Sequence, residues 1–424
     1  MNTKNKKHIA LISVHGDPAV EIGKEEAGGQ NVYVRQVGEA LAKQGWQVDM
    51  FTRQSSDEQP SVINHAPNCR TIRLTAGPED FVPRQEIFGY REEFVEQFLR
   101  FMEKENINYE LIHSNYWISG WVGLELSRKL SIPLAHTYHS LGAVKYESVS
   151  TIPMIASTRL GVEKRCLENA ECIVATSPQE QEHMRSLVSK KGNIDIIPCG
   201  TDIERFGGIT QAEARKELGI DPQAKVIFYV GRFDPRKGIE TLVRAVGQSQ
   251  WQDNENLKLI IGGGSRPGRS DGIERERIEK IVAELGIEGK TEFPGRIDDE
   301  DLPLYYAATD ISVVPSHYEP FGLVAIEAMA SNTPVIASDV GGLQYTVVSE
   351  ETGLLAPPQD NEAFSTAINR ILADPQWRDQ LGSNARKRVE DKFSWQGVAS
   401  QLNELYIRLI EENNASLKPA KATA

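Results

Sequence analysis

Two glutamates lie on either side of a predicted helix start in the stretch Pro315-Ser-His-Tyr-Glu-Pro-Phe-Gly-Leu-Val-Ala-Ile-Glu327. The apolar residues 311–315 indicate the end of a buried strand, and residues 323–330 have strong helical propensity. Unpaired N–H groups and the helix dipole favour anions at such a helix start. The carboxylates of Glu319 and Glu327 can accept hydrogen bonds from sugar hydroxyls. The stretch therefore suits a phosphorylated sugar, although position alone favours solvated surface residues for both glutamates.

Two cations follow another predicted strand, in Val230-Gly-Arg-Phe-Asp-Pro-Arg-Lys-Gly-Ile239. Arg232 and Lys237 could hold a diphosphate and neutralise its charge as it leaves. Their spacing alone leaves a solvated basic loop equally open. The glycines at 262–264 and the stretch Phe293-Pro-Gly-Arg-Ile297 also follow predicted strands, and turns that need glycine would explain both.

The first half of the chain holds further candidates at the ends of its predicted strands. His139 follows the predicted strand 133–138, where a lone histidine is more often structural. Gly28 and Gly29 precede a predicted helix, and they either shape a turn or let a ligand approach the backbone closely. Arg84 and Arg159 would be ordinary surface arginines by position alone.

The motifs of the second half resemble those of retaining GT-B glycosyltransferases that use nucleotide sugars. E-P-F-G-L-x-x-x-E resembles their E-x7-E signature, and G-R-x-x-x-x-K-G resembles their donor-phosphate motif. The resemblance implies that Arg232 and Lys237 stabilise a leaving diphosphate and that Glu327 holds the ribose hydroxyls. It assigns the donor sugar to Glu319 and to the amides of Phe321, Gly322 and Leu323, and the nucleotide base to Arg296 and Ile297.

The first half resembles the sucrose-phosphate synthase and sucrose synthase group within that family. The matching strings are Glu25-Glu-Ala-Gly-Gly-Gln-Asn-Val-Tyr-Val-Arg35 and the H-S-L-G motif that begins at His139. The resemblance implies that Gly29 contacts the donor, that Gln30 contacts the acceptor and that His139 lies at the reacting carbon. It assigns the grip on the acceptor phosphate to Arg84, Tyr116 and Arg159.

One string leaves the acceptor open. Ser114-Asn-Tyr-Trp-Ile-Ser-Gly120 departs from the plant-type G-H-Y-A-D-A-G string and looks closer to the transferases that use inositol phosphate, as do residues 139–145.

The resemblance implies transfer of glucose from UDP-glucose, or ADP-glucose, to fructose 6-phosphate with retained configuration, which gives sucrose 6-phosphate. No motif supplies a covalent nucleophile and no D-x-D metal motif is found, so we expect front-face substitution without a metal or another cofactor. The alternatives are an inositol phosphate or fructose acceptor, a UDP-sugar epimerase, which would not need the arginines, and a non-catalytic sugar-binding protein. A sugar phosphatase that acts on the product is a candidate partner, because no phosphatase-like domain follows the transferase motifs.

Apolar β-type runs alternate with helical patterns along the whole chain, which predicts parallel doubly wound sheets. The predicted fold class is α/β, with the GT-B architecture of two doubly wound Rossmann-like domains facing across a crevice. We expect an acceptor-binding domain over residues 1–203 and a nucleotide-sugar-binding domain over residues 204–395. Residues 396–424 are expected to form a helix that packs back on the first domain, with a frayed polar tail from Asn413.

Composition narrows the class of protein. With 424 residues the chain is long enough for two or three domains, and its net charge of −13 argues against nucleic acid as a partner. No apolar run approaches the ~20 residues of a membrane span. Its four cysteines are scattered and form neither a metal-ligand spacing nor a disulfide framework, so a reducing cytoplasm is the expected compartment.

Overall fold

The computed structural model describes residues 7–20, 28–147 and 152–417. The chain divides into two compact units, the first made of Met1–Ile197 with Trp395–Ala424 and the second of Pro198–Ser394. The sequence had placed these boundaries after residues 203 and 395.

The first unit, where the structure describes it, contains a sheet of eight strands in the order β3-β4-β2-β1-β5-β6-β7-β8. Its strands are β1 (His8–Ile12), β2 (Gln47–Arg53), β3 (Val62–Ala66), β4 (Cys69–Leu74), β5 (Leu111–Asn115), β6 (Leu134–Thr137), β7 (Cys172–Ala175) and β8 (Ile194–Ile196). The pairs are parallel except that β3 runs antiparallel to β4. The carboxyl ends of β1, β5 and β6 therefore lie side by side at one edge of the sheet, where ligands bind in such folds.

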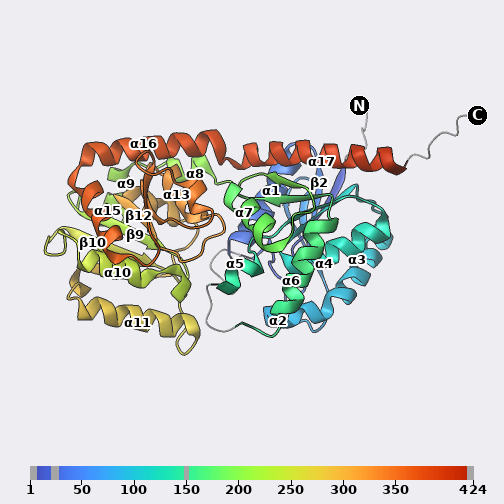
Figure 1. The fold of residues 1–424 in the computed structure, drawn as a ribbon, viewed down its shortest axis with the longest axis horizontal. Helices are drawn as coiled ribbons and strands as arrows, with labels where there is room; N and C mark the ends of the chain where they lie inside the picture. Colours follow the sequence, from blue (N-terminus) through green and yellow to red (C-terminus); the bar gives the residue numbers. More distant parts are fainter. Residues whose placement is uncertain (1–6, 21–27, 148–151, 418–424) are drawn as a thin grey trace, which may run out of the picture. The chain divides into compact units, whose positions relative to one another are not determined.

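Helices cover both faces of this sheet. They are α1 (Gly29–Lys43), α2 (Arg84–Ile87), α3 (Arg91–Glu105), α4 (Trp117–Leu130), α5 (Gly142–Glu147), α6 (Ala156–Asn169), α7 (Pro178–His183) and α17 (Trp395–Leu417). Figure 1 shows α1 beside α17 on one face, and α3, α4 and α6 on the other. Val34, Val37 and Leu41 recur at helical spacing and lie on the buried side of α1.

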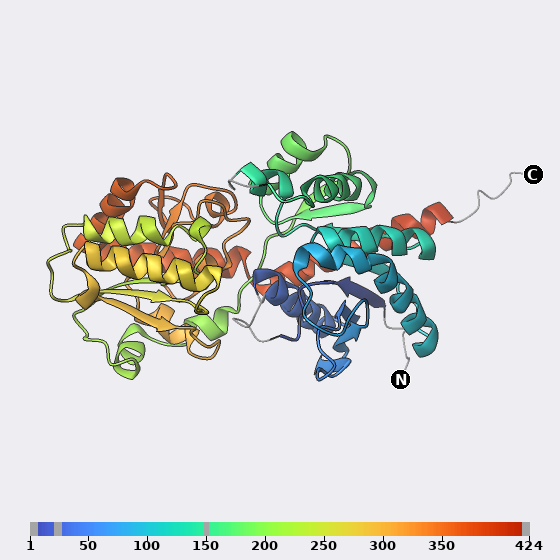
Figure 2. The same ribbon diagram turned by 90° about the horizontal axis from the view of Figure 1, so that it is seen from below.

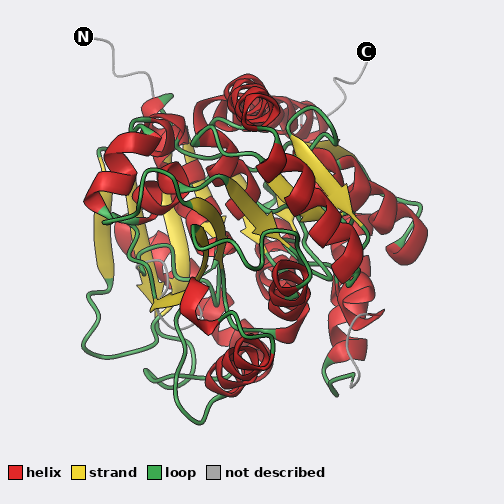
Figure 3. Ribbon diagram, turned by 90° about the vertical axis from the view of Figure 1, so that its left-hand side faces the viewer, coloured by secondary structure: helices red, strands yellow, loops and turns green. Residues whose placement is uncertain are grey.

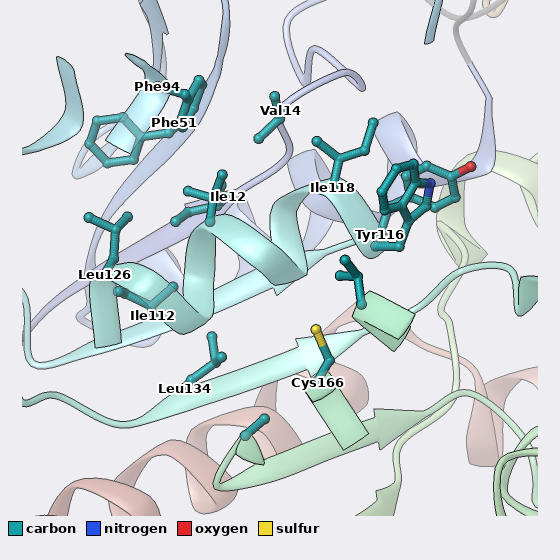
Figure 4. Close-up of a cluster of buried hydrophobic side chains, with 14 of the residues drawn as sticks. Ile12, Val14, Phe51, Phe94, Ile112, Tyr116, Ile118, Leu126, Leu134 and Cys166 are labelled. Carbon is teal, nitrogen blue, oxygen red and sulfur yellow. The ribbon is translucent and has the colours of Figure 1, made fainter. Parts of the chain in front are cut away.

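Apolar side chains from strands and helices meet in the core of the first unit (Figure 4). Ile12 of β1 and Ile112 of β5 share this cluster with Ile118 and Leu126 of α4, and all four are fully buried. Central strands covered on both faces read as continuous apolar runs, which is why β1 showed no alternation in the sequence.

The second unit has an all-parallel sheet of six strands in the order β11-β10-β9-β12-β13-β14. Its strands are β9 (Lys225–Val230), β10 (Leu257–Gly262), β11 (Thr291–Gly295), β12 (Ile311–Val314), β13 (Val335–Ser338) and β14 (Gly353–Ala356). The strand order reverses between β9 and β12, so the loops after these two strands flank a topological switch point. In open α/β sheets ligands bind at such points.

The helices of the second unit form layers on both sides of its strands (Figure 3). They are α8 (Ile203–Gly207), α9 (Gln211–Glu217), α10 (Ile239–Gly247), α11 (Ser270–Glu284), α12 (Leu302–Ala308), α13 (Leu323–Ala330), α14 (Leu343–Thr346), α15 (Asn361–Ala373) and α16 (Pro375–Lys392). Figure 2 looks onto α10 and α11, drawn in yellow-green and yellow, which pack against each other over the sheet. Each unit is a mostly or wholly parallel sheet with helices on both faces, which is the predicted GT-B class of fold.

The last described helix, α17, packs on elements of the first unit. It lies against α1, the Tyr406 hydroxyl meets His113 Nδ1 at 2.5 Å, and Trp46 Nε1 donates to Asn403 at 2.9 Å. Because α17 continues to Leu417, the expected fraying from Asn413 is wrong for residues 413–417. The helix extends there beyond its buried apolar face, which ends at Ile410. Residues 418–424 lie outside the described part. Among the described residues, no helix has the length and apolar character that crossing a bilayer would require.

Candidate active site

In the second unit, Lys237 and Glu319 are brought together from loops that follow different strands. The Nζ atom of Lys237, after β9, lies 2.6 Å from Oε2 of Glu319, after β12, and both side chains are mostly shielded from solvent. Ser316 Oγ donates to the same carboxylate oxygen at 3.4 Å. The pair holds a cation and a carboxylate at the carboxyl ends of two adjacent parallel strands.

Glycines allow the loops around this pair to pack backbone against backbone. Gly238 has φ +68°, and a Cβ there would lie 1.9 Å from the carbonyl oxygen of Pro315. On the other side, Gly342 N donates to Glu319 O at 3.0 Å, and a Cβ on Gly341 would lie 2.3 Å from that oxygen. The loop that carries Glu319 is therefore held between two neighbouring loops, which fixes its carboxylate relative to Lys237.

The helix α13 begins where the sequence predicted. Its N-cap, Gly322, has φ +93°, and a Cβ there would meet Leu343 Cδ2 at 2.6 Å. Phe321 is buried and lies edge-on to Phe393, with ring centres 5.7 Å apart. Ala325 N donates to Gly322 O at 3.0 Å. The N–H groups of Leu323 and Val324 precede the first hydrogen bonds of the helix, so they can bind an anionic or hydroxyl oxygen.

Glu327 lies one turn further along α13. Tyr306 Oη donates to its Oε2 at 2.9 Å. Burial raises the pKa of Glu327 to about 7, while the Tyr306 hydrogen bond and the charge of Arg205 act to lower it and Asp299 acts to raise it. This carboxyl group consequently changes its charge near neutral pH.

Three further residues predicted for the second unit lie at strand ends but outside the Lys237–Glu319 pair. Arg232 is exposed on the loop after β9, and within the described residues no contact joins its guanidinium to Lys237 or Glu319. Arg296 and Ile297 follow β11, where Arg296 pairs with Asp298 at 3.3 Å. A Cβ on Gly262, the last residue of β10, would meet Ile297 Cδ1 at 2.6 Å, so this glycine leaves the space that the Ile297 side chain occupies.

In the first unit, the structure brings Arg84, Tyr116 and Arg159 together. The guanidinium carbons of Arg159 and Arg84 lie 5.1 Å and 6.0 Å from the centre of the Tyr116 ring. Arg159 Nη1 also donates to Tyr116 Oη at 3.3 Å. Arg84 differs from Arg159 in having no carboxylate partner and an unpaired buried Nε among the described residues. We call these three residues, with His15 and His139, the arginine–histidine cluster.

Two members of this cluster have backbone conformations that non-glycine residues rarely adopt. Tyr116 has φ +75° and His139 has φ +58°. Such conformations cost about 1–3 kcal/mol each and concentrate at functional sites, where the surrounding structure enforces them. Tyr116 is held by its N–H, which donates to Thr137 O at 2.8 Å, and this bond links the ends of β5 and β6.

His139 is positioned by neighbours on β5 and α1. Its Nε2 lies 2.8 Å from Asn115 Oδ1, and its ring meets the edge of Tyr33 with centres 4.8 Å apart. Burial lowers the pKa of His139 to about 3, with a smaller contribution from His113, so the imidazole is neutral. Gln30 lies beside the same strand end, because its Nε2 donates to Ser13 Oγ at 2.9 Å and to Asn115 O at 3.4 Å.

The glycine-rich string that carried part of the resemblance is only partly described. Gly28 is the N-cap of α1 and Gly29 is its first residue, while residues 25–27 lie outside the described part. The described residues contain no group of three His, Cys, Asp or Glu side chains placed to hold a metal ion.

The sequence analysis missed two residues of this site. Glu163 is fully buried, and its carboxylate accepts from Arg159 Nε at 2.7 Å and from Gly142 N at 2.9 Å. Burial raises the pKa of Glu163, and Arg159 opposes that rise. The i,i+4 spacing of Arg159 and Glu163 was a usable signal, whereas their burial could not be read from a helix rich in charge. The second missed residue is His15, whose ring lies on Tyr116 with centres 4.4 Å apart.

Comparison with known proteins identifies both halves of the chain. The family model for Glycosyltransferase Family 4 matches residues 27–205, and that for Glycosyl transferases group 1 matches residues 210–388. A D-inositol 3-phosphate glycosyltransferase from Corynebacterium glutamicum is 37% identical over 96% of this chain and 98% of its own. The corresponding protein from Corynebacterium efficiens is 36% identical over 94% of each chain.

Solved structures give a second set of relatives. A sucrose-phosphate synthase from Thermosynechococcus elongatus is 53% identical, with a TM-score of 0.88 over 96% of this chain and 100% of its own. Anabaena HepE, at 21% identity, shares the fold with a TM-score of 0.75 over 95% of this chain and 100% of its own.

Proposed function

Because the chain belongs to the GT-B glycosyltransferases, we propose that it transfers glucose from UDP-glucose to fructose 6-phosphate, which gives sucrose 6-phosphate and UDP. The observation that carries a phosphorylated acceptor is the pair of guanidinium groups at Tyr116. Guanidinium groups bind phosphate oxygens with charge-assisted hydrogen bonds. Arg84 has no carboxylate partner among the described residues, so its charge is available to the acceptor phosphate.

The choice of fructose 6-phosphate over other sugar phosphates rests on relatedness. The chain is 53% identical to a sucrose-phosphate synthase and 37% identical to a D-inositol 3-phosphate glycosyltransferase. The higher identity to the sucrose-phosphate synthase, over nearly the whole chain, favours fructose 6-phosphate as the acceptor. ADP-glucose is the second donor to be tested.

The proposed donor site lies on the second unit. Lys237 and Arg232 stabilise the diphosphate as it leaves, and Glu319, held by Lys237 at 2.6 Å, accepts hydrogen bonds from hydroxyls of the glucosyl group. The amides of Phe321, Gly322 and Leu323 donate to oxygen atoms of the donor. Glu327 accepts from the ribose hydroxyls, and Arg296 and Ile297 are the further donor contacts proposed on the same unit.

In the proposed reaction, a hydroxyl oxygen of the acceptor forms a bond to the anomeric carbon of glucose as the bond from that carbon to the diphosphate oxygen breaks. The acceptor proton passes to the leaving diphosphate, which departs as UDP, so no side chain needs to become covalently attached. Attack from the face that the diphosphate leaves retains the anomeric configuration. Neutral His139, with Gln30 beside it, contacts the sugars near the reacting carbon.

D-Inositol 3-phosphate is the second candidate acceptor, because the C. glutamicum and C. efficiens relatives carry that name. The two candidates share a phosphate that the same arginines would hold. They differ in the ring that presents the attacking hydroxyl.

The test is UDP release from UDP-glucose by the purified chain, with fructose 6-phosphate, fructose or D-inositol 3-phosphate as acceptor. We expect release with fructose 6-phosphate and a sucrose 6-phosphate product that a phosphatase converts to sucrose. Release with D-inositol 3-phosphate alone would assign the second candidate, and release with fructose alone would contradict the role of the arginines. Conversion of UDP-glucose without any acceptor would indicate an epimerase, and binding without turnover a sugar-binding protein.

A further inference from the structure

Asn115, the last residue of β5, touches both residues proposed above to contact the sugars near the reacting carbon. Its side-chain Oδ1 lies 2.8 Å from His139 Nε2, and its backbone carbonyl accepts from Gln30 Nε2 at 3.4 Å. Only 1% of Asn115 is exposed to solvent. Because so little of it is exposed, Asn115 is placed to act on a sugar through these neighbours.

Neighbouring backbone carbonyls determine which way the Asn115 amide faces. Its Nδ2 atom donates to Ile12 O at 3.4 Å and to His113 O at 3.3 Å. An amide nitrogen donates hydrogen bonds and an amide oxygen accepts them, so exchanging the two would set the oxygen against two carbonyl oxygens. The Oδ1 atom consequently faces His139.

The orientation of this amide decides which nitrogen of His139 carries the proton. The Oδ1 atom of Asn115 only accepts hydrogen bonds, so Nε2 of His139 donates across the 2.8 Å that separates them. Burial lowers the pKa of His139 to about 3, so its imidazole is neutral and carries a single ring proton. Nδ1 therefore has a lone pair, which can accept a hydrogen bond from a hydroxyl.

Packing alone does not select between the two nitrogens of His139. Its backbone has φ +58°, a conformation that the surrounding structure must enforce. The imidazole meets the edge of Tyr33, whose own ring lies edge-on to Trp395 with centres 6.0 Å apart. These rings restrict the plane of the imidazole, but an aromatic contact does not distinguish Nδ1 from Nε2. That distinction comes from Asn115.

We propose that Asn115 is a positioning residue for the transfer, which holds His139 by its Nε2–H so that the lone pair of Nδ1 receives a hydroxyl of the sugar. The proposal rests on the function proposed above, since it takes from there the place of His139 near the reacting carbon. The contact of Asn115 with Gln30 is made by the backbone, so replacing the Asn115 side chain tests the His139 contact separately.

The experiment is a double-mutant cycle of Asn115→Leu and His139→Ala. Leucine has nearly the shape of asparagine and removes the acceptor for Nε2–H. In the wild-type background we expect Asn115→Leu to lower kcat about 10-fold, the effect of one lost hydrogen bond, with KM values for both substrates within about twofold of wild type. In the His139→Ala background it should change kcat less than about twofold, because a residue that acts through His139 then has nothing to position.

Asn403→Leu is the matched control. Asn403 is a partly buried asparagine of α17 that accepts from Trp46 Nε1 at 2.9 Å, so its replacement should lower the melting temperature and leave kcat at the wild-type value. An equal loss of kcat from Asn115→Leu in both backgrounds, or no loss in either, would overturn the proposal and leave Asn115 as a residue of the fold.

Nitrogen NMR of ¹⁵N-histidine-labelled wild type tests the ring itself, and it decides should Asn115→Leu fail to fold. The signals of His139 are identified by their absence from His139→Ala. We expect a protonated Nε2, and an unprotonated Nδ1 whose resonance shifts when UDP-glucose is added while that of Nε2 changes little. A protonated Nδ1, or a Nδ1 resonance that UDP-glucose leaves in place, would contradict the proposal.

Wild-type turnover separates this proposal from the function on which it rests. If wild type uses another acceptor, the synthesis of sucrose 6-phosphate is ruled out, and the cycle is measured with the acceptor that is used. If wild type transfers glucose to no sugar or sugar phosphate, both proposals fall.

Discussion

Glu319 is tied by its ion pair with Lys237, at 2.6 Å, to a loop that precedes it by 82 residues. The pair forms at the point where β9 and β12 lie side by side, so the pairing of two strands determines the contact. A change to either residue therefore acts on both loops of the proposed donor site.

Replacing Lys237 by methionine should lower kcat about 10²- to 10³-fold, because one fixed cation at the leaving diphosphate would be lost. Steady-state UDP release measures kcat, and the melting temperature shows whether the variant is folded. Lys258→Met is the matched control, since Lys258 pairs with Glu292 at 2.7 Å elsewhere in the same unit and should leave kcat unchanged. A Lys237 variant with wild-type kcat would remove Lys237 from the mechanism.

Replacing Arg84 by alanine should raise the KM for fructose 6-phosphate about 10- to 100-fold, the effect of one lost hydrogen bond to a charged group. Turnover with unphosphorylated fructose, however slow, should change little, because it carries no phosphate. Arg100→Ala, an exposed arginine on α3, is the control. Equal effects on both acceptors would show that Arg84 supports the fold and does not hold a phosphate.

The carboxylate of Glu163 accepts a hydrogen bond from Arg159 Nε at 2.7 Å. Replacing Glu163 by glutamine should weaken this contact and so loosen the position of the Arg159 side chain. We expect a lower melting temperature, a free energy of unfolding reduced by about 1–3 kcal/mol, and an acceptor KM raised about tenfold. Glu180→Gln supplies the comparison, because Glu180 is also buried but accepts from Thr176 at 2.7 Å. If both variants shift the KM alike, Glu163 has no specific influence on Arg159.

The affinity for UDP should decrease as the pH falls from 8 to 6. Burial raises the pKa of Glu327 from 4.5 to about 7, so its carboxylate, the proposed acceptor of the ribose hydroxyls, becomes protonated over this range. Glu327→Gln should bind UDP about 10- to 100-fold more weakly at pH 8 and show a smaller pH dependence, measured by calorimetry. Glu276→Gln, at an exposed position of α11, should titrate like wild type.

Stability provides an independent reading of the same group. A carboxyl group whose pKa is raised on folding binds its proton more tightly in the folded chain than in the unfolded chain. The contribution of protonated Glu327 to the free energy of unfolding is therefore full below pH 4.5 and is lost as the pH rises through about 7. Glu327→Gln should therefore melt higher than wild type at pH 8, with little difference at pH 4.5. A lower melting temperature at pH 8 would contradict the raised pKa.

Strong local patterns made much of the second unit predictable. The structure has β9, β12 and α13 at the residues that the sequence indicated, because continuous apolar runs meet strong helix formers there. The motif strings likewise placed Lys237 and Glu319 in one site. That their charged atoms touch depends on β9 lying beside β12, which neither string contains.

The first unit shows what local patterns leave out. The strand β3, with the sequence VINHA, has no fully buried residue and no alternation of apolar and polar side chains, so no period-2 signal predicted its antiparallel pairing with β4. Glu163 and His15 were missed for a related reason. Glu163 lies on a charged helix and His15 on a polar loop, and neither kind of segment indicates burial in the sequence. Both residues belong to the site because they pack beside residues that are distant in sequence.

The division of the chain has a consequence for its synthesis. The first unit needs α17, the last described helix, since Tyr406 meets His113 in the core and Arg408 pairs with Asp195. Pro198–Ser394 is continuous and leaves the ribosome before that helix does. Domains normally complete their folding in the order in which they are made. Here the first unit cannot complete its fold until α17 has been made. The second unit, although its residues emerge later than most of the first, can therefore finish folding before it.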